Sequence, residues 1–404
     1  MKAYREILDF IEEENVQFIR LAFFDVFGKQ KNIAIMPGEL HRAFTEGISF
    51  YGGAIAGFGT AARSDLFLHP DPTTFSLVPW RPIDGRVAKM FCDITYPDGT
   101  PFERDSRAIL KQAVSTAREK GVEVYFGPEV EFYVFKKDDY GNPTNIPLDN
   151  ASYMDVDPED RGDNIRRDIC FTLQEMNITP ETSHHEQGPG QNEVDFRYSD
   201  ALTSADNTAT FKWVVKSIAE SNGNWVDFSP KPLPDKPGNG MHLNISILDK
   251  SGKDRTDSFM AGILHYILDM TLFLNPTAES YNRLGHSMEA PQYVSWSAEN
   301  RSQLIRIPAS DQKRIELRSP DPTANPYIAY ALLIYAGLEG LEKGLVPSAP
   351  VDRNLYQVDV ALEEDLTPLP SSISEAAKYA NQSAFIREHI PASLLDAYLK
   401  QAQQ

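Results

Sequence analysis

Apolar positions in the first part of the chain follow two different periods. Residues 2–14 carry their apolar side chains on one stripe, which predicts an amphipathic helix. The run 16–26 is rich in Phe and Ile, Gly28 follows it as a turn, and a second short run covers 32–36. This pattern predicts a β-hairpin, and the glycine-rich stretch 50–60 predicts a loop.

The rest of the chain mixes strand and helix patterns without a regular βαβ order. Residues 183–198 carry Gly-Pro-Gly at their centre, which predicts two strands joined by a tight turn. Because no repeat is visible, we predict an α+β fold with domains 1–103 and 104–404. The other predicted elements are strands around 79 and over 87–95, 122–135, 241–247 and 313–318, and helices over 106–121, 158–176, 204–221, 257–272 and 325–343.

Composition narrows the class of protein. A chain of 404 residues exceeds one typical core, and a net charge of −19 argues against a nucleic-acid partner. The N-terminus is charged and does not resemble a signal peptide. The apolar stretch 327–341 is too short to span a bilayer, so we expect a core helix, no membrane partner and a cytoplasmic location. The two cysteines lack metal-ligand spacing and are expected to be free thiols.

Acidic side chains gather on the predicted strands. Glu129 and Glu131 are two residues apart, so both point to one face of a strand. A lone glutamate on a strand is usually solvated, but two among Phe, Tyr and Val need partners. Carboxylates with one imidazole suit Mg²⁺ or Mn²⁺, and six ligands could hold two ions for phosphoryl transfer. The six candidates are Glu129, Glu131, Glu186, Glu193, His242 and Glu316. The neighbouring pair His184 and His185 is expected in a loop or at the surface.

Arginines form a second signal in the C-terminal half. Each surface arginine alone means little, but a dense set beside an acidic strand in an acidic protein suggests recognition of phosphate or carboxylate. This set, which lies in the segments that also carry Glu289 and Glu316, is Arg283, Arg301, Arg306, Arg314 and Arg318.

Several segments resemble the glutamine synthetase family, over most of residues 16–345. They are GPEVEF (127–132), HHEQGPGQNEVDFRYSDALTSADNTATFKWVVK (184–216), PKPL with GNGMHLNIS (230–246), NRLGHSMEAPQYVSWSAENRS (282–302) and RIELRSPDPTANPYIAYALL (314–333). The resemblance implies a small N-terminal β-grasp domain and a larger catalytic domain with a curved antiparallel sheet flanked by helices. It also implies a homo-oligomer, usually a dodecamer of two hexameric rings, with active sites at subunit junctions.

The resemblance also implies roles for individual residues. Glu131, Glu186 and Glu193 match the ligands of one metal, and Glu129, His242 and Glu316 match those of the other. Arg283, Arg301 and Arg318 match residues that hold the glutamate carboxylates and the transferring phosphoryl group, while Arg306 and Arg314 match positions near the ATP phosphates. Gly238 matches a backbone position beside glutamate, Ser246 a residue near the nucleotide, and Glu289 the flap residue that helps to take a proton from the amine.

The activity implied is an ATP-dependent ligase that forms a γ-glutamyl amide from glutamate and ammonia or a primary amine. ATP is a substrate, and two or more Mg²⁺ or Mn²⁺ ions are expected. The glutamate γ-carboxylate attacks the γ-phosphate of ATP, and a flap around Glu289 closes over the γ-glutamyl phosphate to exclude water.

Three positions depart from the family pattern. Tyr51 stands where the family has an Asp that helps to bind ammonium, with Gly53 in place of a Ser. Asn244 replaces a His and can still hydrogen-bond a phosphate, and Pro237 replaces an Asn that contacts glutamate. Losing one buried charge-assisted contact costs roughly 1.5–3 kcal/mol, or about 10–100-fold. Tyr51 is therefore hypothesised to reshape the amine site, unless a neighbouring acidic residue takes the place of the Asp.

Three alternatives remain open from the sequence. The first is a γ-glutamyl polyamine or monoamine synthetase that does not favour ammonia, which a panel of amines would reveal. The second is a catalytically silent homologue with a binding or regulatory role, which would form no ADP with any amine. The third, a guanidino kinase of related fold, is weaker because Glu289 points to amide formation.

Overall fold

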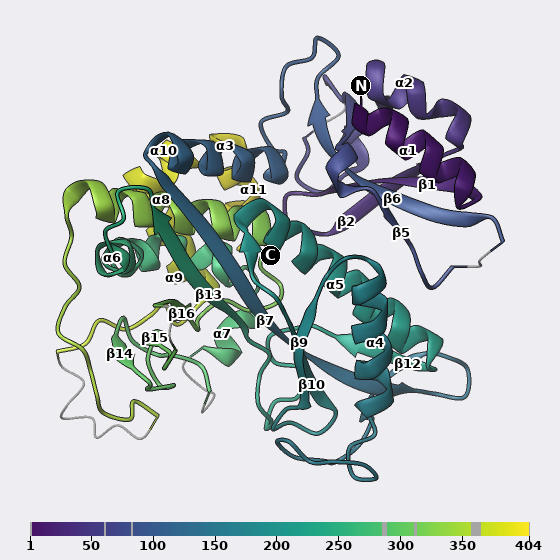
Figure 1. Cartoon of the computed structure of the whole chain (residues 1–404). Helices are drawn as coiled ribbons and strands as arrows, with labels where there is room; N and C mark the ends of the chain where they lie inside the picture. The colour runs from purple at the N-terminus through teal and green to yellow at the C-terminus, as the bar shows by residue number, and fades with distance from the viewer. Residues whose placement is uncertain are drawn as a thin grey trace.

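The computed structural model describes residues 2–59, 62–81, 84–284, 289–310, 313–356 and 365–403. The N-terminal segment forms a sheet with α1 and α2, drawn in purple and blue at the upper right of Figure 1. In the described part this sheet has six strands in the order β2-β1-β6-β4-β3, with β5 beside β6, and β1 runs parallel to β6. Its elements are α1 (Lys2–Glu13), β1 (Val16–Phe24), β2 (Gln30–Ile35), α2 (Leu40–Thr45), β3 (Ile48–Tyr51), β4 (Asp65–Pro70), β5 (Ser76–Leu77) and β6 (Arg86–Thr95).

A larger sheet is built around one long strand, β7 (Val122–Lys137). Its ten described strands follow the order β14-β15-β16-β13-β7-β10-β9, while β8, β11 and β12 also pair with β7. All described strand pairs of this sheet are antiparallel except β14 with β15. The other strands are β8 (Pro143–Pro147), β9 (Pro180–His185), β10 (Gln191–Phe196), β11 (Ser199–Asp200), β12 (Asn224–Asp227), β13 (Met241–Asp249), β14 (Trp296–Ala298), β15 (Ile305–Ile307) and β16 (Ile315–Leu317).

Helices pack around the larger sheet (Figure 1). They are α3 (Ser106–Glu119), α4 (Asp163–Glu175), α5 (Ala201–Ser221), α6 (Thr256–Leu274), α7 (Ser280–Arg283), α8 (Pro326–Lys343), α9 (Ile373–Gln382), α10 (Ala384–His389) and α11 (Ala392–Gln401). The core-helix prediction for 327–341 is confirmed, because nearly every side chain of α8 is buried. Asn325 caps this helix, Pro326 opens it and Gly344 ends it at φ 60°.

Helix α6 is, by length and composition alone, apolar enough to cross a membrane, with 61% of the qualifying window buried inside the fold. Its burial has a packing cause. A Cβ at Gly262 would lie 2.0 Å from the carbonyl oxygen of Ala336, so the two helix backbones of α6 and α8 approach closely. A buried core helix meets the same length and composition test as a membrane span.

The prediction of an α+β fold with a small sheet followed by a larger one is confirmed. The loop expected over 50–60 is wrong at its start, because β3 reaches Tyr51 and a 3₁₀ turn covers Gly52–Ala54. Strand β4 was not predicted, since Asp65 and Pro70 at its ends are residue types depleted from strands. The helix predicted from 158 starts at Asp163, after Gly162.

The N-terminal hairpin of β1 and β2 contacts the C-terminal helices α8 and α11. Asn325 Nδ2 and the Tyr398 hydroxyl both donate to the carbonyl oxygen of Val26, at 3.1 and 3.0 Å. Gly28 turns at φ 80°, and a Cβ there would lie 2.9 Å from Asn325 Cα. Only glycine meets both requirements.

Candidate active site

Four adjacent strands bring the acidic residues to one surface of the larger sheet. On β7, Glu129 and Glu131 share a face because side chains alternate along a strand. The pairing register then sets His242 opposite Glu129 and Glu193 opposite Glu131. Glu316 on β16 pairs with Asn244 of β13, two residues after His242, so Glu316 lies close to His242.

One three-residue cluster is formed by Glu129, His242 and Glu316. Their ligand atoms all lie within 4.8 Å of one another. His242 Nδ1 is 3.7 Å from Glu129 Oε2 and 3.8 Å from Glu316 Oε1. These are the three residues that the resemblance assigned to one metal.

A second cluster combines His184, Glu186 and Glu193, again within 4.8 Å of one another. His184 Nε2 is 2.8 Å from Glu186 Oε1 and 3.9 Å from Glu193 Oε1. Glu131, expected from the sequence as the partner of these two glutamates, lies beside the cluster and accepts a hydrogen bond of 2.7 Å from the Gly240 amide. His184 was not among the predicted ligands.

The expectation that His184 and His185 lie in a loop or at the surface is wrong. Both belong to β9, and His185 is fully buried. Its Nε2 lies 3.0 Å from Asp149 Oδ1 and its Nδ1 lies 2.5 Å from the carbonyl oxygen of Glu186. The adjacent histidines face opposite ways, so one enters the site while the other packs behind the turn that carries Glu186.

The electrostatics of these clusters fit a hard divalent cation. Burial and the nearby Glu186 carboxylate raise the pKa of Glu131 to about 8, and burial with Asp195 and Glu131 raises the pKa of Glu193 well above its ordinary value. Burial and the Arg318 guanidinium lower the pKa of His242 far below its usual range. A divalent cation would offset the repulsion between these crowded carboxylates, and the neutral imidazole can serve as a further ligand.

We expect metal binding to stabilise the protein more strongly at high pH than at low pH. The pKa of Glu131 is about 8 in the fold against 4.5 ordinarily. Its protonated form therefore stabilises the metal-free fold fully below pH 4.5, and this contribution is lost as the pH rises through 8. A cation that binds Glu131 must displace this proton. The cation therefore binds more strongly at a pH where the carboxylate is already deprotonated.

The measurement is the difference in Tm with saturating Mg²⁺ and with chelator, at pH values of about 6 and about 8. The difference should be larger at the higher pH, and Glu131→Gln should weaken that dependence. Equal differences at both pH values would contradict the prediction.

The clusters open into a pocket of about 400 Å³. Arg301 and Arg318 line it, so two guanidinium groups face the acidic surface. Glu289 also lines it, held by a hydrogen bond from the Gln187 side-chain amide. Burial and Glu186 raise the pKa of Glu289. Residues 285–288, the other part of the predicted flap, lie outside the described residues.

A second pocket of about 350 Å³ adjoins the first and shares Glu129 and Asp195 with it. Its lining includes Asn244, Ser246 and Arg314, three of the four residues expected near ATP. Arg314 Nε donates to Asn244 Oδ1 at 2.9 Å, and Asn244 Nδ2 donates to Glu129 Oε1 at 2.8 Å. This chain of bonds joins the second pocket to the first cluster.

Two predicted arginines and one glycine are absent from the described lining of both pockets. Arg306 pairs with Glu316 at 2.5 Å. Arg283 is buried and donates to the carbonyl oxygens of Ser319 and Arg318, at 2.7 and 3.0 Å. A Cβ at Gly238 would lie 3.0 Å from the Arg283 side chain, so these two are in contact.

Tyr51 is not brought to this site within one chain. It ends β3, is 53% exposed, and is absent from the described lining of both pockets. Its ring covers Gly53, where a Cβ would lie 2.6 Å from the Tyr51 hydroxyl. The two departures from the family pattern, Tyr51 and Gly53, therefore depend on each other sterically.

Sequence reasoning missed several residues of the pocket wall. Besides His184, these are Tyr153, Gln187, Asp195 and Tyr356. Asp195 has a signal in the sequence, because it stands two residues after Glu193 on β10 and so shares its face. Burial and Glu129 raise its pKa to about 6.

Comparisons with known proteins agree with this geometry. A family model described as glutamine synthetase, catalytic domain, matches residues 103–404, and one described as glutamine synthetase, beta-grasp domain, matches residues 15–97. The chain is 42% identical to a glutamine synthetase of Clostridium saccharobutylicum over 399 residues, covering 95% of this chain and 90% of the relative. It is also 42% identical to one of Methanosarcina mazei over 411 residues, covering 98% and 92%.

Solved structures share the fold. A GmaS chain in complex with ADP superposes with a TM-score of 0.89 at 27% identity, covering 98% of this chain and 94% of that one. A glutamine synthetase of Plasmodium falciparum superposes with a TM-score of 0.87 at 23% identity, covering 99% and 95%. The second likeness speaks for the fold alone.

Proposed function

Because the chain belongs to the glutamine synthetase family, we propose that it joins ammonia to the γ-carboxyl group of glutamate with ATP, through γ-glutamyl phosphate. One observation carries this proposal. Residues of the acidic and imidazole clusters line a pocket together with Arg301, Arg318 and Glu289. This pocket shares Glu129 and Asp195 with a second pocket of about 350 Å³. The family uses ATP and divalent metals, and Mg²⁺ or Mn²⁺ suits the oxygen-rich donor set here.

The residues divide the work between two steps. Glu129, His242 and Glu316 would hold one cation, and Glu131, Glu186 and Glu193, with His184, would hold the other. When bound, these ions neutralise phosphate oxygens. The glutamate γ-carboxylate attacks the γ-phosphorus of ATP and ADP leaves, while Arg301 and Arg318 stabilise charge on the transferring group. Arg283 and Gly238 support the glutamate site, and Asn244, Ser246, Arg306 and Arg314 the nucleotide.

The second step forms the amide. Ammonia attacks the acyl carbon of γ-glutamyl phosphate, inorganic phosphate leaves, and one proton must be removed from the nitrogen. Glu289 suits this role because burial and Glu186 raise its pKa and the Gln187 amide orients its carboxylate. Closure of its segment over the acyl phosphate would exclude water.

The assembly and location follow as part of the same proposal. We propose domains 1–103 and 104–404, a division supported by family models that match 15–97 and 103–404. The family assembles into oligomers, and a dodecamer of two hexameric rings is the proposed form. A cytoplasmic location suits an enzyme with ATP and glutamate as substrates.

The direct test measures phosphate release from ATP with glutamate and Mg²⁺ or Mn²⁺, using ammonia, a panel of primary amines, and hydroxylamine as a permissive control. We expect the highest kcat/KM with ammonia. A primary amine that clearly exceeds ammonia would replace the proposal by the amine-synthetase alternative, and no turnover with any acceptor would leave the catalytically silent alternative.

A variant of Tyr51 tests the amine site. If Tyr51 enters the site of an adjacent subunit, Tyr51→Asp restores a carboxylate for ammonium and should lower the KM for ammonia by about 10–100-fold. The KM for ATP should not change. Tyr140→Asp, a substitution of another exposed tyrosine, is the matched control. An unchanged KM for ammonia would place Tyr51 outside the amine site.

A further inference from the structure

A separate cavity of about 270 Å³ lies between the N-terminal sheet and α5. Among the residues that the structure describes, it shares no lining residue with the two pockets of the candidate active site. Ser76 and Lys89 of the N-terminal sheet form one side, while Asn177, Thr203 and Thr210 form the other. A single buried water needs only about 10–15 Å³ of such space, so the cavity is many times larger than a bridging water requires.

Lys89 is the unusual residue in its wall. The side chain is only 4% exposed, yet it ends in an amino group that becomes a cation when protonated. Its Nζ donates to Thr210 Oγ1 at 3.1 Å and lies 3.7 Å from the centre of the Phe91 ring. An ammonium has three donors, and among the described residues no carboxylate lies within ion-pairing distance of this one. Burial lowers the pKa of Lys89 to about 7.

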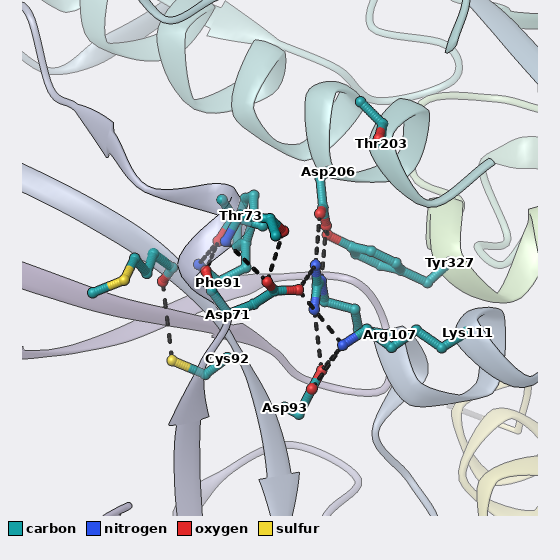
Figure 2. Close-up of polar contacts among 12 residues, drawn as sticks. Asp71, Thr73, Phe91, Cys92, Asp93, Arg107, Lys111, Thr203, Asp206 and Tyr327 are labelled. Atoms are coloured by element: carbon teal, nitrogen blue, oxygen red, sulfur yellow. Dashed lines mark hydrogen bonds and ion pairs between the residues drawn. The ribbon is translucent and has the colours of Figure 1, made fainter. Parts of the chain in front are cut away.

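The nearest acid, Asp206, also lines the cavity, and its charge opposes the lowering of the Lys89 pKa. Asp206 forms no ion pair with Lys89 among the described contacts, and its oxygens accept hydrogen bonds from other groups. Asp206 Oδ1 accepts from Arg107 Nε at 3.0 Å and from the Tyr327 hydroxyl at 2.6 Å, and Oδ2 accepts from Arg107 Nη2 at 2.9 Å. Figure 2 shows that Arg107 also bonds Asp71 and Asp93, in addition to Asp206. The aspartates of this region are therefore already paired with Arg107, Tyr327 and Lys111.

The remaining wall offers donors and a short apolar surface. The side chains of Asn177, Thr203 and Asn207 line the cavity and can each donate a hydrogen bond. Met176 and Ile178 supply apolar contact. A cavity with a buried cation, spare donors and an apolar wall matches a small molecule whose charged end is an oxyanion.

We propose that this cavity binds a small metabolite with a carboxylate or phosphate group, and that Lys89 pairs with that group. The occupant contacts β6 of the N-terminal sheet and α5 of the larger part of the chain together. Binding to the folded state alone therefore stabilises the contact between them. Helix α5 follows directly on the β10–β11 segment that carries Glu193, so the occupied cavity braces one wall of the candidate active site.

The test titrates inorganic phosphate, and separately acetate and succinate, against the full-length protein at constant ionic strength set with chloride. Tm and calorimetric Kd are measured for the wild type, Lys89→Met and Lys212→Met. Lys212 is the matched control, since burial also lowers its pKa to about 7 and it does not line the cavity. Lys89→Met removes a buried charge and keeps the length of the side chain, so it should fold.

We expect at least one anion to raise the Tm of the wild type and of Lys212→Met, with a Kd at least 10-fold weaker for Lys89→Met. Preference for phosphate over the carboxylates, or the reverse, identifies the class of occupant. Anions could also bind at Arg301 and Arg318, so crystals soaked in selenate supply the position through anomalous scattering. A selenate peak beside Lys89 Nζ supports the proposal. Equal affinity in Lys89→Met, or a peak only beside the two arginines, overturns it.

Discussion

Replacing Glu129 by glutamine should lower kcat by about 10³-fold, the effect of losing one preorganised electrostatic contact to the reacting phosphate. Glu129 belongs to the first cluster and also lines both pockets, so it stands where the nucleotide and the cation would meet. The amide has nearly the same shape but carries no charge. The side-chain oxygen of the introduced glutamine can still accept the hydrogen bond that Asn244 donates to Glu129.

Two quantities are measured. The first is kcat for ADP formation at saturating ATP, glutamate and Mg²⁺, and the second is the dependence of the rate on Mg²⁺ concentration. We expect the concentration of Mg²⁺ for half-maximal rate to rise as well, because a ligand loses its charge. Glu123→Gln, on the same strand and the same face but away from both pockets, is the matched control. A Glu129→Gln enzyme with near-normal kcat would remove this residue from the metal site.

Replacing Arg107 by methionine should destabilise the fold by about 3–5 kcal/mol, the cost of leaving the buried Asp206 carboxylate without its partner. Arg107 on α3 is 1% exposed. Its guanidinium bonds Asp71 and Asp93 of the N-terminal segment at 2.9 and 3.0 Å, and Asp206 of α5 at 2.9 Å (Figure 2). Burial lowers the pKa of Arg107, but Asp206, with Tyr327 and Asp93, holds it above its usual range. The Arg107 guanidinium thus links the N-terminal segment to α5.

The measurement is urea unfolding followed by tryptophan fluorescence, with the change read from the midpoint at unchanged slope. Arg118→Met on the same helix is the control, because Arg118 is exposed and its loss should change stability little. Unfolding of Arg107→Met at the wild-type midpoint would show that the three acids are solvated or paired without it. A moderate loss would indicate that Lys111, which lies 2.7 Å from Asp93, compensates in part.

The sequence alone determined the features that depend on local periodicity. Side chains alternate along a strand whatever the strand pairs with, so the spacing of Glu129 and Glu131 was enough to place both on one face. The burial of α8 followed from its continuous apolar run. Together with the motifs, these patterns were sufficient for the α+β fold, the family and the six acidic and imidazole candidates.

Only the tertiary structure decided which of these groups meet. His184 joins Glu186 and Glu193 because β9 and β10 pair in one register. Arg283 is buried and absent from the described pocket lining, since burial is a property of the packed chain. Arg107 and Asp206 are 99 residues apart, as no local pattern could indicate. That Lys89 has no ion-pair partner among the described residues is also visible only in the fold, where Asp206 is already bonded to Arg107 and Tyr327. Register, burial and competition for partners arise from contacts between distant segments, and a single sequence carries no local signal for them.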